Sequence, residues 1–357
     1  MSLRSGSLVA LVAALLLAAT GAAAQSSAPF APPAAKAKVV RLLAFAGFFE
    51  PRALEAFEQA TGYAVAYDAY ALAVEIPDKW KDGPYDVVAL PGPTLAHRIA
   101  AGALARLDRR KLPHARAIQP AVDAKLAAYD PGDAFSAPFG WAPYGLIFDA
   151  QKVQERLGGP PSSWSALLDP RVAAKLSACG VATPNARDAM FVAAWRLMSI
   201  DPARLRPLDI RSAGALMGRA KPAMQSFALS DPVGAIARGT ICLTAGTPGE
   251  AAAAKQRAKK AGAHTEIGFV EPKEGGAVEI DAFAIPRDAP NPEVAYKLID
   301  FLLTPEIAQE NAQAAGLNSS ESAPDAELVK RLWPLGAFDD AYAQALEAEW
   351  TRLRTSK

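Results

Sequence analysis

Short apolar runs alternate with amphipathic stretches along most of the chain. Residues 39–45 (VVRLLAF) form an apolar run typical of a buried strand. After the loop AFAGFFEP, a helix is predicted to start at Pro51, to carry Leu54 and Phe57 on one face, and to end at Gly62. A second strand, YAVAY, follows directly. The pattern therefore predicts a strand, a loop rich in apolar residues, a helix and a strand.

The same alternation continues to the C-terminal part. KDGPYDVVALPGP contains a strand between turn residues, and TLAHRIAAGALARL has the spacing of an amphipathic helix. From Tyr144 the pattern recurs with the strands in YGLIFDAQKV and CGVATPN and the helices in SWSALLDPRVAAKL and DAMFVAAWRLM. Strands that alternate with helices of this length predict two α/β units, each with a mostly parallel sheet flanked by helices.

The first 24 residues have the pattern of a cleavable signal peptide. Arg4 precedes an apolar run, and Ala22 and Ala24 provide small residues at a cleavage site before Gln25. A membrane anchor is the alternative, but the apolar run is short for a membrane span. Residues 25–37 are rich in Pro, Ala and Ser and are expected to form a flexible leader. We therefore expect an exported protein.

Composition narrows the classes of partner. The chain has 357 residues and is 51% hydrophobic, so it can bury a large core. Its formal net charge is +1, so it lacks the excess positive charge that binding to nucleic acid or to an anionic membrane would favour. Its two cysteines, Cys179 and Cys242, favour a disulfide in an exported chain. Two buried free thiols are the alternative, and a metal site made of two lone cysteines is disfavoured.

The sequence carries no recognisable catalytic constellation. Its three histidines, His97, His114 and His264, are scattered, and none belongs to a metal-ligand pair. A nucleophile elbow, a phosphate-binding loop and a dinucleotide glycine fingerprint are all absent from the sequence. We therefore expect no catalytic residue, no metal, no cofactor and no enzymatic activity.

A series of landmarks resembles one family over about 300 residues. In order, they include FEQATGYAVAYDAY, YDVVALPGPTL, PFGWAPYGLIFDAQKV, SACGVAT, GTICLTAGTPGEA and PKEGGAVEIDAFAIP. The chain resembles the polyamine-binding branch of the periplasmic solute-binding proteins of ABC transporters, in particular putrescine-binding proteins. The resemblance implies a periplasmic, monomeric receptor with a type II periplasmic-binding fold, which holds a polyamine between two lobes and delivers it to a membrane permease. The two cysteines fall where similar proteins carry a disulfide.

The resemblance also implies a division of the chain into two lobes. Lobe 1 is expected to comprise residues 38–143 and 279–318, and lobe 2 to comprise residues 144–278 and 319–357. The ligand-contacting positions that it implies are Phe45, Gly47, Phe48, Pro93, Asp188, Thr247, Glu250, Glu279 and Asp281.

Several of these positions depart from the family pattern. Where putrescine binders read Trp-Ser-Asp-Tyr, residues 45–48 read Phe-Ala-Gly-Phe, so the aromatic surface remains but the hydroxyl and the carboxylate are absent. Pro93 replaces a serine, Thr247 a tryptophan and Leu317 a tyrosine, and the acid of the second lobe falls at Ala189, beside Asp188. Asp281 matches the family aspartate, Glu250 replaces another aspartate, and Glu279 stands where an aromatic residue is usual.

The acidic and aromatic positions each have a structural alternative. Glu279 and Asp281 are two residues apart on a predicted strand, so they share one face. They would form an anionic end of a cation site, or else pair with basic residues or cap backbone groups. Glu250 follows a helix start, where a carboxylate also stabilises the helix. Phe45 and Phe48 are expected to line the cleft, and Phe49 to lie in the core.

Two functional hypotheses follow. The first is a transport receptor for a polyamine, and the second is a receptor for a different small organic cation or a sensing protein that is not coupled to transport. The substituted polar positions keep the second hypothesis open.

Overall fold

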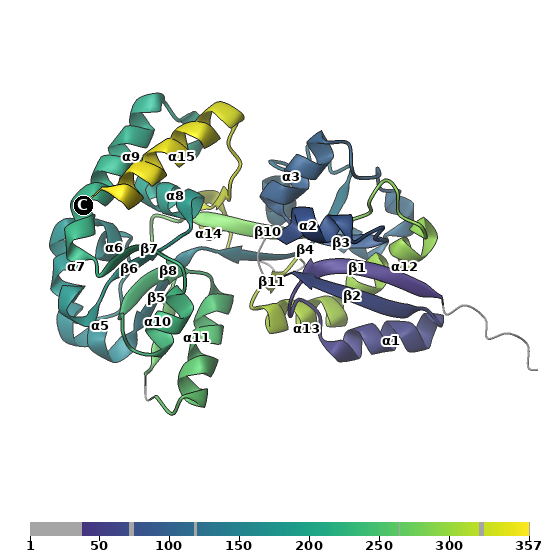
Figure 1. The fold of residues 1–357 in the computed structure, drawn as a ribbon, viewed down its shortest axis with the longest axis horizontal. Coiled ribbons are helices and arrows are strands. Elements are labelled where there is room, and N and C mark those ends of the chain that lie inside the picture. The colour runs from purple at the N-terminus through teal and green to yellow at the C-terminus, as the bar shows by residue number, and fades with distance from the viewer. Residues whose placement is uncertain (1–37, 71–74, 118–119, 264, 321–324, 357) are drawn as a thin grey trace, which may run out of the picture. The chain divides into compact units, whose positions relative to one another are not determined.

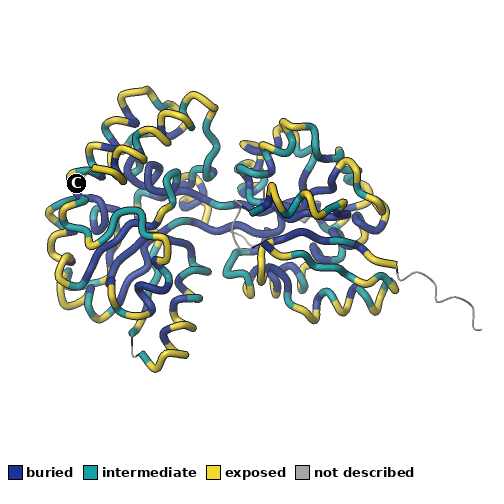
Figure 2. Tube along the Cα trace, in the orientation of Figure 1, coloured by how far each residue is buried: buried dark blue, intermediate teal, exposed yellow. Residues whose placement is uncertain are grey.

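A computed structural model describes residues 38–70, 75–117, 120–263, 265–320 and 325–356. The expected signal peptide (1–24) and leader (25–37) lie outside these residues. The described chain forms a seven-stranded sheet and a second group of strands, each covered by helices (Figure 1). Figure 2 shows that the central strands are buried along most of their length, while the helices expose their outer faces.

The first sheet has the strand order β11-β4-β10-β3-β1-β2, with β12 paired to β10. Its strands are β1 (Val39–Phe45), β2 (Ala64–Tyr70), β3 (Val87–Pro91), β4 (Ser136–Pro143), β10 (Ala277–Ala284), β11 (Asn318–Ser319) and β12 (Trp333–Pro334). β1 is parallel to β2 and β3, whereas β10 is antiparallel to β3 and β4. The strand and helix boundaries expected for 39–62 agree with β1 and α1.

Helices cover both faces of this sheet. The helices that contribute to it are α1 (Pro51–Thr61), α2 (Ile76–Lys81), α3 (Gly92–Ala100), α4 (Pro120–Leu126), α12 (Pro292–Leu302), α13 (Pro305–Ala315) and α14 (Ala326–Arg331). Alternate residues of β1 face opposite layers: Leu42 lies in one buried cluster with Phe57 of α1, and Leu43 lies in another with Leu95 of α3. The near-continuous apolar run of β1 is thus explained by burial on both faces.

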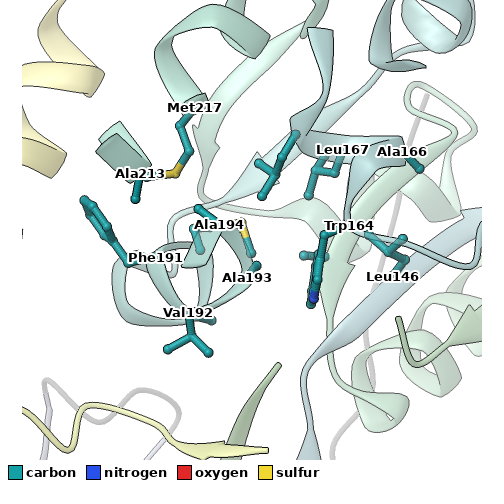
Figure 3. Close-up of a cluster of buried hydrophobic side chains, with 14 of the residues drawn as sticks. Leu146, Trp164, Ala166, Leu167, Phe191, Val192, Ala193, Ala194, Ala213 and Met217 are labelled. Carbon is teal, nitrogen blue, oxygen red and sulfur yellow. The ribbon is translucent and has the colours of Figure 1, made fainter. Parts of the chain in front are cut away.

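The second group contains a sheet with the order β8-β5-β9 and the pair β6-β7. Its strands are β5 (Gly145–Asp149), β6 (Ala182–Pro184), β7 (Ser226–Leu229), β8 (Leu243–Gly246) and β9 (Ile267–Val270). Its helices are α5 (Ala150–Leu157), α6 (Ser165–Leu168), α7 (Pro170–Leu176), α8 (Arg187–Leu197), α9 (Pro207–Ala220), α10 (Pro232–Ala237), α11 (Pro248–Lys260) and α15 (Asp340–Thr355). Figure 3 shows its main core, where Trp164, Phe191 and Met217 pack together.

Single 3-10 turns connect several of these elements: η2 (Arg109–Lys111), η3 (His114–Ala117), η4 (Ser177–Cys179), η5 (Pro202–Arg204) and η6 (Lys221–Ala223). The helix predicted for SWSALLDPRVAAKL is split into α6 and α7. Asp169 ends the first helix, and its carboxylate accepts a hydrogen bond from the backbone N–H of Arg171 at 2.8 Å, while Pro170 opens the second. None of the helices in the described ranges combines the length and the apolar character that a membrane crossing needs.

The sheets are mixed and not mostly parallel, which corrects the expectation for strand direction. β5 runs antiparallel to both β8 and β9, and β10 runs antiparallel to both of its long neighbours. The reason lies in the connections. β10 enters the first sheet from the second group of strands, and therefore from the opposite end to β1 and β3.

The described chain passes between the two groups of elements at Tyr144, at 271–276 and again at 335–339. The second passage thus precedes β10. β12 pairs with β10, and Leu328 of α14 is buried among residues of the first sheet, whereas α15 packs on α8 and α9. Residues 319–320 and 325–334 therefore lie with the first sheet, although the sequence expectation assigned 319–357 as one block to lobe 2.

Cys179 and Cys242 form a disulfide, as expected from the sequence. Their Cα atoms are 5.5 Å apart, and the bond joins η4 to the residue that precedes β8. Cys242 is fully buried. The disulfide thus lies within the second group of elements and includes no residue of the three passages to the first sheet.

Candidate ligand-binding site

A cavity of about 750 Å³ is lined by residues from both groups of elements. This volume lies within the usual range of small-molecule sites. Seven of the predicted site residues line it: Phe45, Gly47, Phe48, Thr247, Glu250, Glu279 and Asp281. Pro93 and Asp188 do not.

Glu279 and Asp281 project from β10 into the cavity. They are two residues apart on the strand and share a face with Phe283, which lies in the aromatic core below. Asp281 is only 2% exposed. Among the described residues, no ion pair or side-chain hydrogen bond reaches either carboxylate. The alternative of a bridge to a lysine or arginine is therefore not seen.

Burial changes the protonation of these acids. Loss of solvation and, to a smaller extent, the nearby charge of Glu250 raise the pKa of Glu279 to about 7. Burial, together with the charge of Glu279, holds the pKa of Asp281 well above its usual range. Each carboxylate thus lacks the solvent or cation that would stabilise its charge, and a ligand cation would supply this stabilisation.

Glu250 combines a structural role with exposure to the cavity. It is the third residue of α11, and its Oε2 accepts a hydrogen bond from the backbone N–H of Thr247 at 2.8 Å. The Thr247 hydroxyl in turn accepts one from the N–H of Glu250 at 3.3 Å, which completes a capping box. Burial raises the pKa of Glu250, while the hydrogen bonds from Thr247 oppose this shift. This geometry fits both roles considered for Glu250, namely stabilisation of the helix start and contact with a ligand cation.

Aromatic rings form the wall of the cavity on the first sheet. Phe45 lies 5.2 Å from Phe48 between ring centroids and 5.8 Å from Tyr70, with an edge-on arrangement to the tyrosine. Phe45 is 37% exposed, whereas Phe48 is 7% exposed and also packs on Phe139 of the core. Phe49 is buried and does not line the cavity. The apolar loop after β1 therefore serves both the core and the cavity.

Gly47 occupies the position of the absent carboxylate. Its φ is +87°, a conformation that favours glycine, and nothing lies within 4 Å of the place where a Cβ would stand. An aspartate would therefore find space there but would strain the backbone. The loop thus has at Gly47 a backbone conformation that glycine adopts readily and that an aspartate adopts only with strain.

Pro93 and Asp188 lie away from the cavity because the backbone of Gly336 lies against both. A Cβ on Gly336 would stand 2.9 Å from Pro93 and 3.2 Å from a carboxylate oxygen of Asp188. Asp188 is ion-paired with Arg187 at 2.6 Å. Ala189, which stands in place of the family acid, is buried in the core of the second group. Pro93 and Asp188 therefore stay predicted ligand contacts that do not line this cavity.

Two backbones meet at the rim of the cavity. Gly249 of α11 and Gly316, which ends α13, are so close that a Cβ on Gly249 would stand 3.0 Å from the carbonyl oxygen of Ala315 and 3.1 Å from the Cα of Gly316. Both glycines line the cavity. Only residues without side chains allow this approach between the two groups of elements.

Sequence reasoning missed several residues that line the cavity: Glu50, Tyr70, Tyr144 and Gln313. The hydroxyl of Tyr70 donates to the carbonyl of Ala89 at 2.9 Å, and burial together with the charge of Asp281 raises its pKa, so the phenol remains neutral. Tyr70 could have been predicted as a lining residue, because parallel pairing of β1 with β2 places it beside Phe45.

The lining found in the described residues contains phenylalanine and tyrosine but no tryptophan. In the same residues, no group of three or more His, Cys, Asp or Glu side chains could hold a metal ion. The acids of the cavity are thus better suited to an organic cation that also contacts the aromatic wall.

Comparisons with known proteins agree with this geometry. Residues 52–335 match the family described as bacterial extracellular solute-binding protein. The putrescine-binding periplasmic protein SpuD of Pseudomonas aeruginosa is 29% identical over 344 residues, which cover 91% of this chain and 94% of SpuD. A putrescine/agmatine-binding protein of Pseudomonas aeruginosa is 30% identical over 80% of this chain and 78% of its own length. These relatives are solute-binding receptors and not enzymes.

The fold is shared with solved structures. The spermidine/putrescine ABC transporter substrate-binding protein PotD from Streptococcus pneumoniae superimposes with a TM-score of 0.77 at 18% identity, covering 89% of this chain and 98% of PotD. The PotD lipoprotein of Treponema pallidum gives a TM-score of 0.75 at 21% identity, covering 89% of this chain and all of that chain (100%). Both likenesses support a two-lobed type II periplasmic-binding fold.

Proposed function

Because this chain belongs to the bacterial extracellular solute-binding protein family, we propose that it captures a polyamine-like organic cation in the periplasm and delivers it to an ABC permease. The observation that carries this proposal is the cavity itself. Three carboxylates, those of Glu250, Glu279 and Asp281, face it beside the rings of Phe45 and Phe48. Ammonium groups bind carboxylates through charge-assisted hydrogen bonds and lie favourably over aromatic faces.

The relatives support the class of ligand. The names of SpuD and of the putrescine/agmatine-binding protein state that they bind small aliphatic or guanidino amines. The same relatives and the expected signal peptide support a periplasmic location, and we propose that the receptor acts as a monomer. The lobe division that we propose keeps the expected ranges, but moves the described residues 319–320 and 325–334 to lobe 1, where β12 and α14 pack.

The uneven distribution of charge narrows the ligand further. The acids of β10 and α11 lie at the inner end, whereas the loop after β1 has Gly47 in place of a carboxylate. Each missing charge-assisted contact should cost about 1.5–3 kcal/mol, or roughly ten- to a hundredfold in affinity. A short symmetric diamine such as putrescine is therefore expected to bind more weakly than family membership alone implies.

Isothermal titration calorimetry of the wild type and of Asp281→Asn tests this function. A thermal-shift panel of polyamines, amino acids and quaternary amines first identifies which cations stabilise the protein. Asp281→Asn should weaken every organic cation by at least about tenfold, because its carboxylate is buried and has no other counter-ion among the described residues. Asp288→Asn removes one charge at an exposed position outside the cavity and serves as the matched control.

Two results would contradict the proposal. The first is a wild-type protein that binds none of the cations in the panel. The second is tight cation binding that Asp281→Asn leaves unchanged.

A role in sensing is the second candidate function. It is favoured by the replacement of the family clamp around Gly47 and Ala189, since a receptor released from transport need not keep the ligand of its relatives. Uptake assays in cells that contain or lack the receptor would separate the two functions.

A further inference from the structure

Glu50 places a carboxylate at the cavity on the loop that lacks one at Gly47. It immediately precedes α1, and it lines the cavity together with Phe45 and Phe48. Its side chain does not cap its own helix. In the described part of the chain, no ion pair or hydrogen bond uses this carboxylate. Its charge is therefore available to a ligand.

The backbone of Glu50 is held in a defined position. Its N–H donates to Oδ1 of Asn311 at 2.9 Å, and Asn311 is 1% exposed on α13. A hydrogen bond to a buried side chain fixes the loop, so the carboxylate starts from a defined anchor. The amino end of α1 also favours a negative charge at this position.

Neighbouring cations do not neutralise Glu50. Arg52 pairs with Glu310 at 3.2 Å, and Arg257, which also lines the cavity, pairs with Asp231 at 3.3 Å. Both guanidinium groups thus have carboxylate partners of their own. Glu50 adds a negative charge that the protein leaves without a counter-ion in the described residues.

The loop after β1 crosses the sheet toward β4 before it reaches Glu50. Phe48 packs on Phe139 of β4 with ring centroids 5.0 Å apart. Phe49 stacks on Phe283 of β10 at 5.7 Å. Glu50 thus lies past these rings, and its carboxylate and those of β10 line the same cavity from different elements.

We propose that Glu50 is a second cation-binding residue, which receives a second ammonium or guanidino group of the ligand. The proposal rests on the proposed function, because the first ammonium group is held by Glu279 and Asp281. The preferred ligand class is a chain with two or more amino or guanidino groups. A monoamine would use only the acids of β10.

Calorimetry with spermidine, putrescine and n-butylamine tests the preference for ligands with two or more cationic groups. Glu50→Gln should weaken spermidine about three- to tenfold, as expected for a partly exposed charge pair, and should leave n-butylamine unchanged. Glu50→Asp keeps the charge and should retain most of the preference for spermidine. Glu55→Gln, an exposed acid on α1 outside the cavity, is the matched control and should have no effect.

The outcomes separate this inference from the proposed function. If Glu50→Gln weakens all three amines equally, or none, while Asp281→Asn still weakens binding at least about tenfold, the role of Glu50 is wrong and the receptor function stands. If the wild type binds none of the three amines, the role of Glu50 is overturned, whereas the receptor function is overturned only when no cation of the wider panel binds. Melting curves of each variant, which should match the wild type, exclude loss of folding as the cause.

Discussion

At the scale of single residues, Glu279 shows how a ligand site reduces the stability of the empty protein. Its pKa is about 7 in the folded chain and 4.5 in its ordinary environment, so the folded state binds more protons between these values. Stability must therefore fall as the pH rises from about 4.5 to about 7, and the loss is complete above 7.

Replacing the carboxylate of Glu279 with an amide should remove this loss of stability at high pH. We expect Glu279→Gln to raise the free energy of unfolding by roughly 1–3 kcal/mol at pH 8 and to have little effect at pH 4. Urea unfolding of the ligand-free protein at both pH values measures this difference. Equal effects at the two pH values would show that packing and not ionisation decides the outcome. The same variant should bind cations more weakly.

The residues of the site were predictable in part. Glu279 and Asp281 could be predicted because alternation on a strand fixes which side chains share a face. The position of Pro93 and Asp188 beside Gly336, and not in the lining of the cavity, could not be predicted, because Gly336 is more than 140 residues away from both in the sequence. Glu50 was missed since its role depends on a buried asparagine of α13, which no local pattern reveals.

At the scale of elements, the contact between α11 and the end of α13 predicts an effect of a single methyl group. Gly249→Ala would place a Cβ against the backbone of Ala315 and Gly316, and these groups would have to move apart by a few tenths of an ångström. Since both glycines line the cavity, we expect ligand affinity to fall about three- to tenfold. The stability of the ligand-free protein should not fall, because alanine favours a helix over glycine by up to about 1 kcal/mol.

Calorimetry and thermal melting of the same variant separate these two effects. Gly218→Ala on α9 is the control, because its Cβ would meet only Leu353, at an ordinary contact distance of 3.5 Å. A Gly249 variant with unchanged affinity would show that the contact does not constrain the cavity.

Element boundaries followed the sequence wherever a local signal was sufficient. The strand at 39–45 and the helix from Pro51 to Thr61 could be predicted because apolar spacing, a proline and a glycine all agree. The direction of β10 could not, because pairing partners are set by how the chain returns from the second group of elements. The same limit explains why the third passage, which the expected lobe ranges put between residues 318 and 319, lies instead at 335–339.

At the scale of the whole molecule, the disulfide should stabilise the fold without acting on the ligand. It closes a loop of 63 residues, which corresponds to about 4 kcal/mol of loop entropy. A double Cys179→Ala, Cys242→Ala variant should therefore unfold at a lower denaturant concentration, while its folded fraction binds the same cation with unchanged affinity. Denaturant titration and calorimetry measure the two quantities. Weakened binding by fully folded variant would contradict this separation.

The absence of tryptophan from the described lining of the cavity has a spectroscopic consequence. Trp141 and Trp333 lie on strands next to passages between the two groups of elements, and Trp164 donates its indole N–H to Gly275 within one passage at 2.7 Å. A bound amine would touch none of these rings. A change in tryptophan emission during titration with a ligand would therefore arise from rearrangement of the segments between the lobes. Direct quenching by the ligand would not contribute to it.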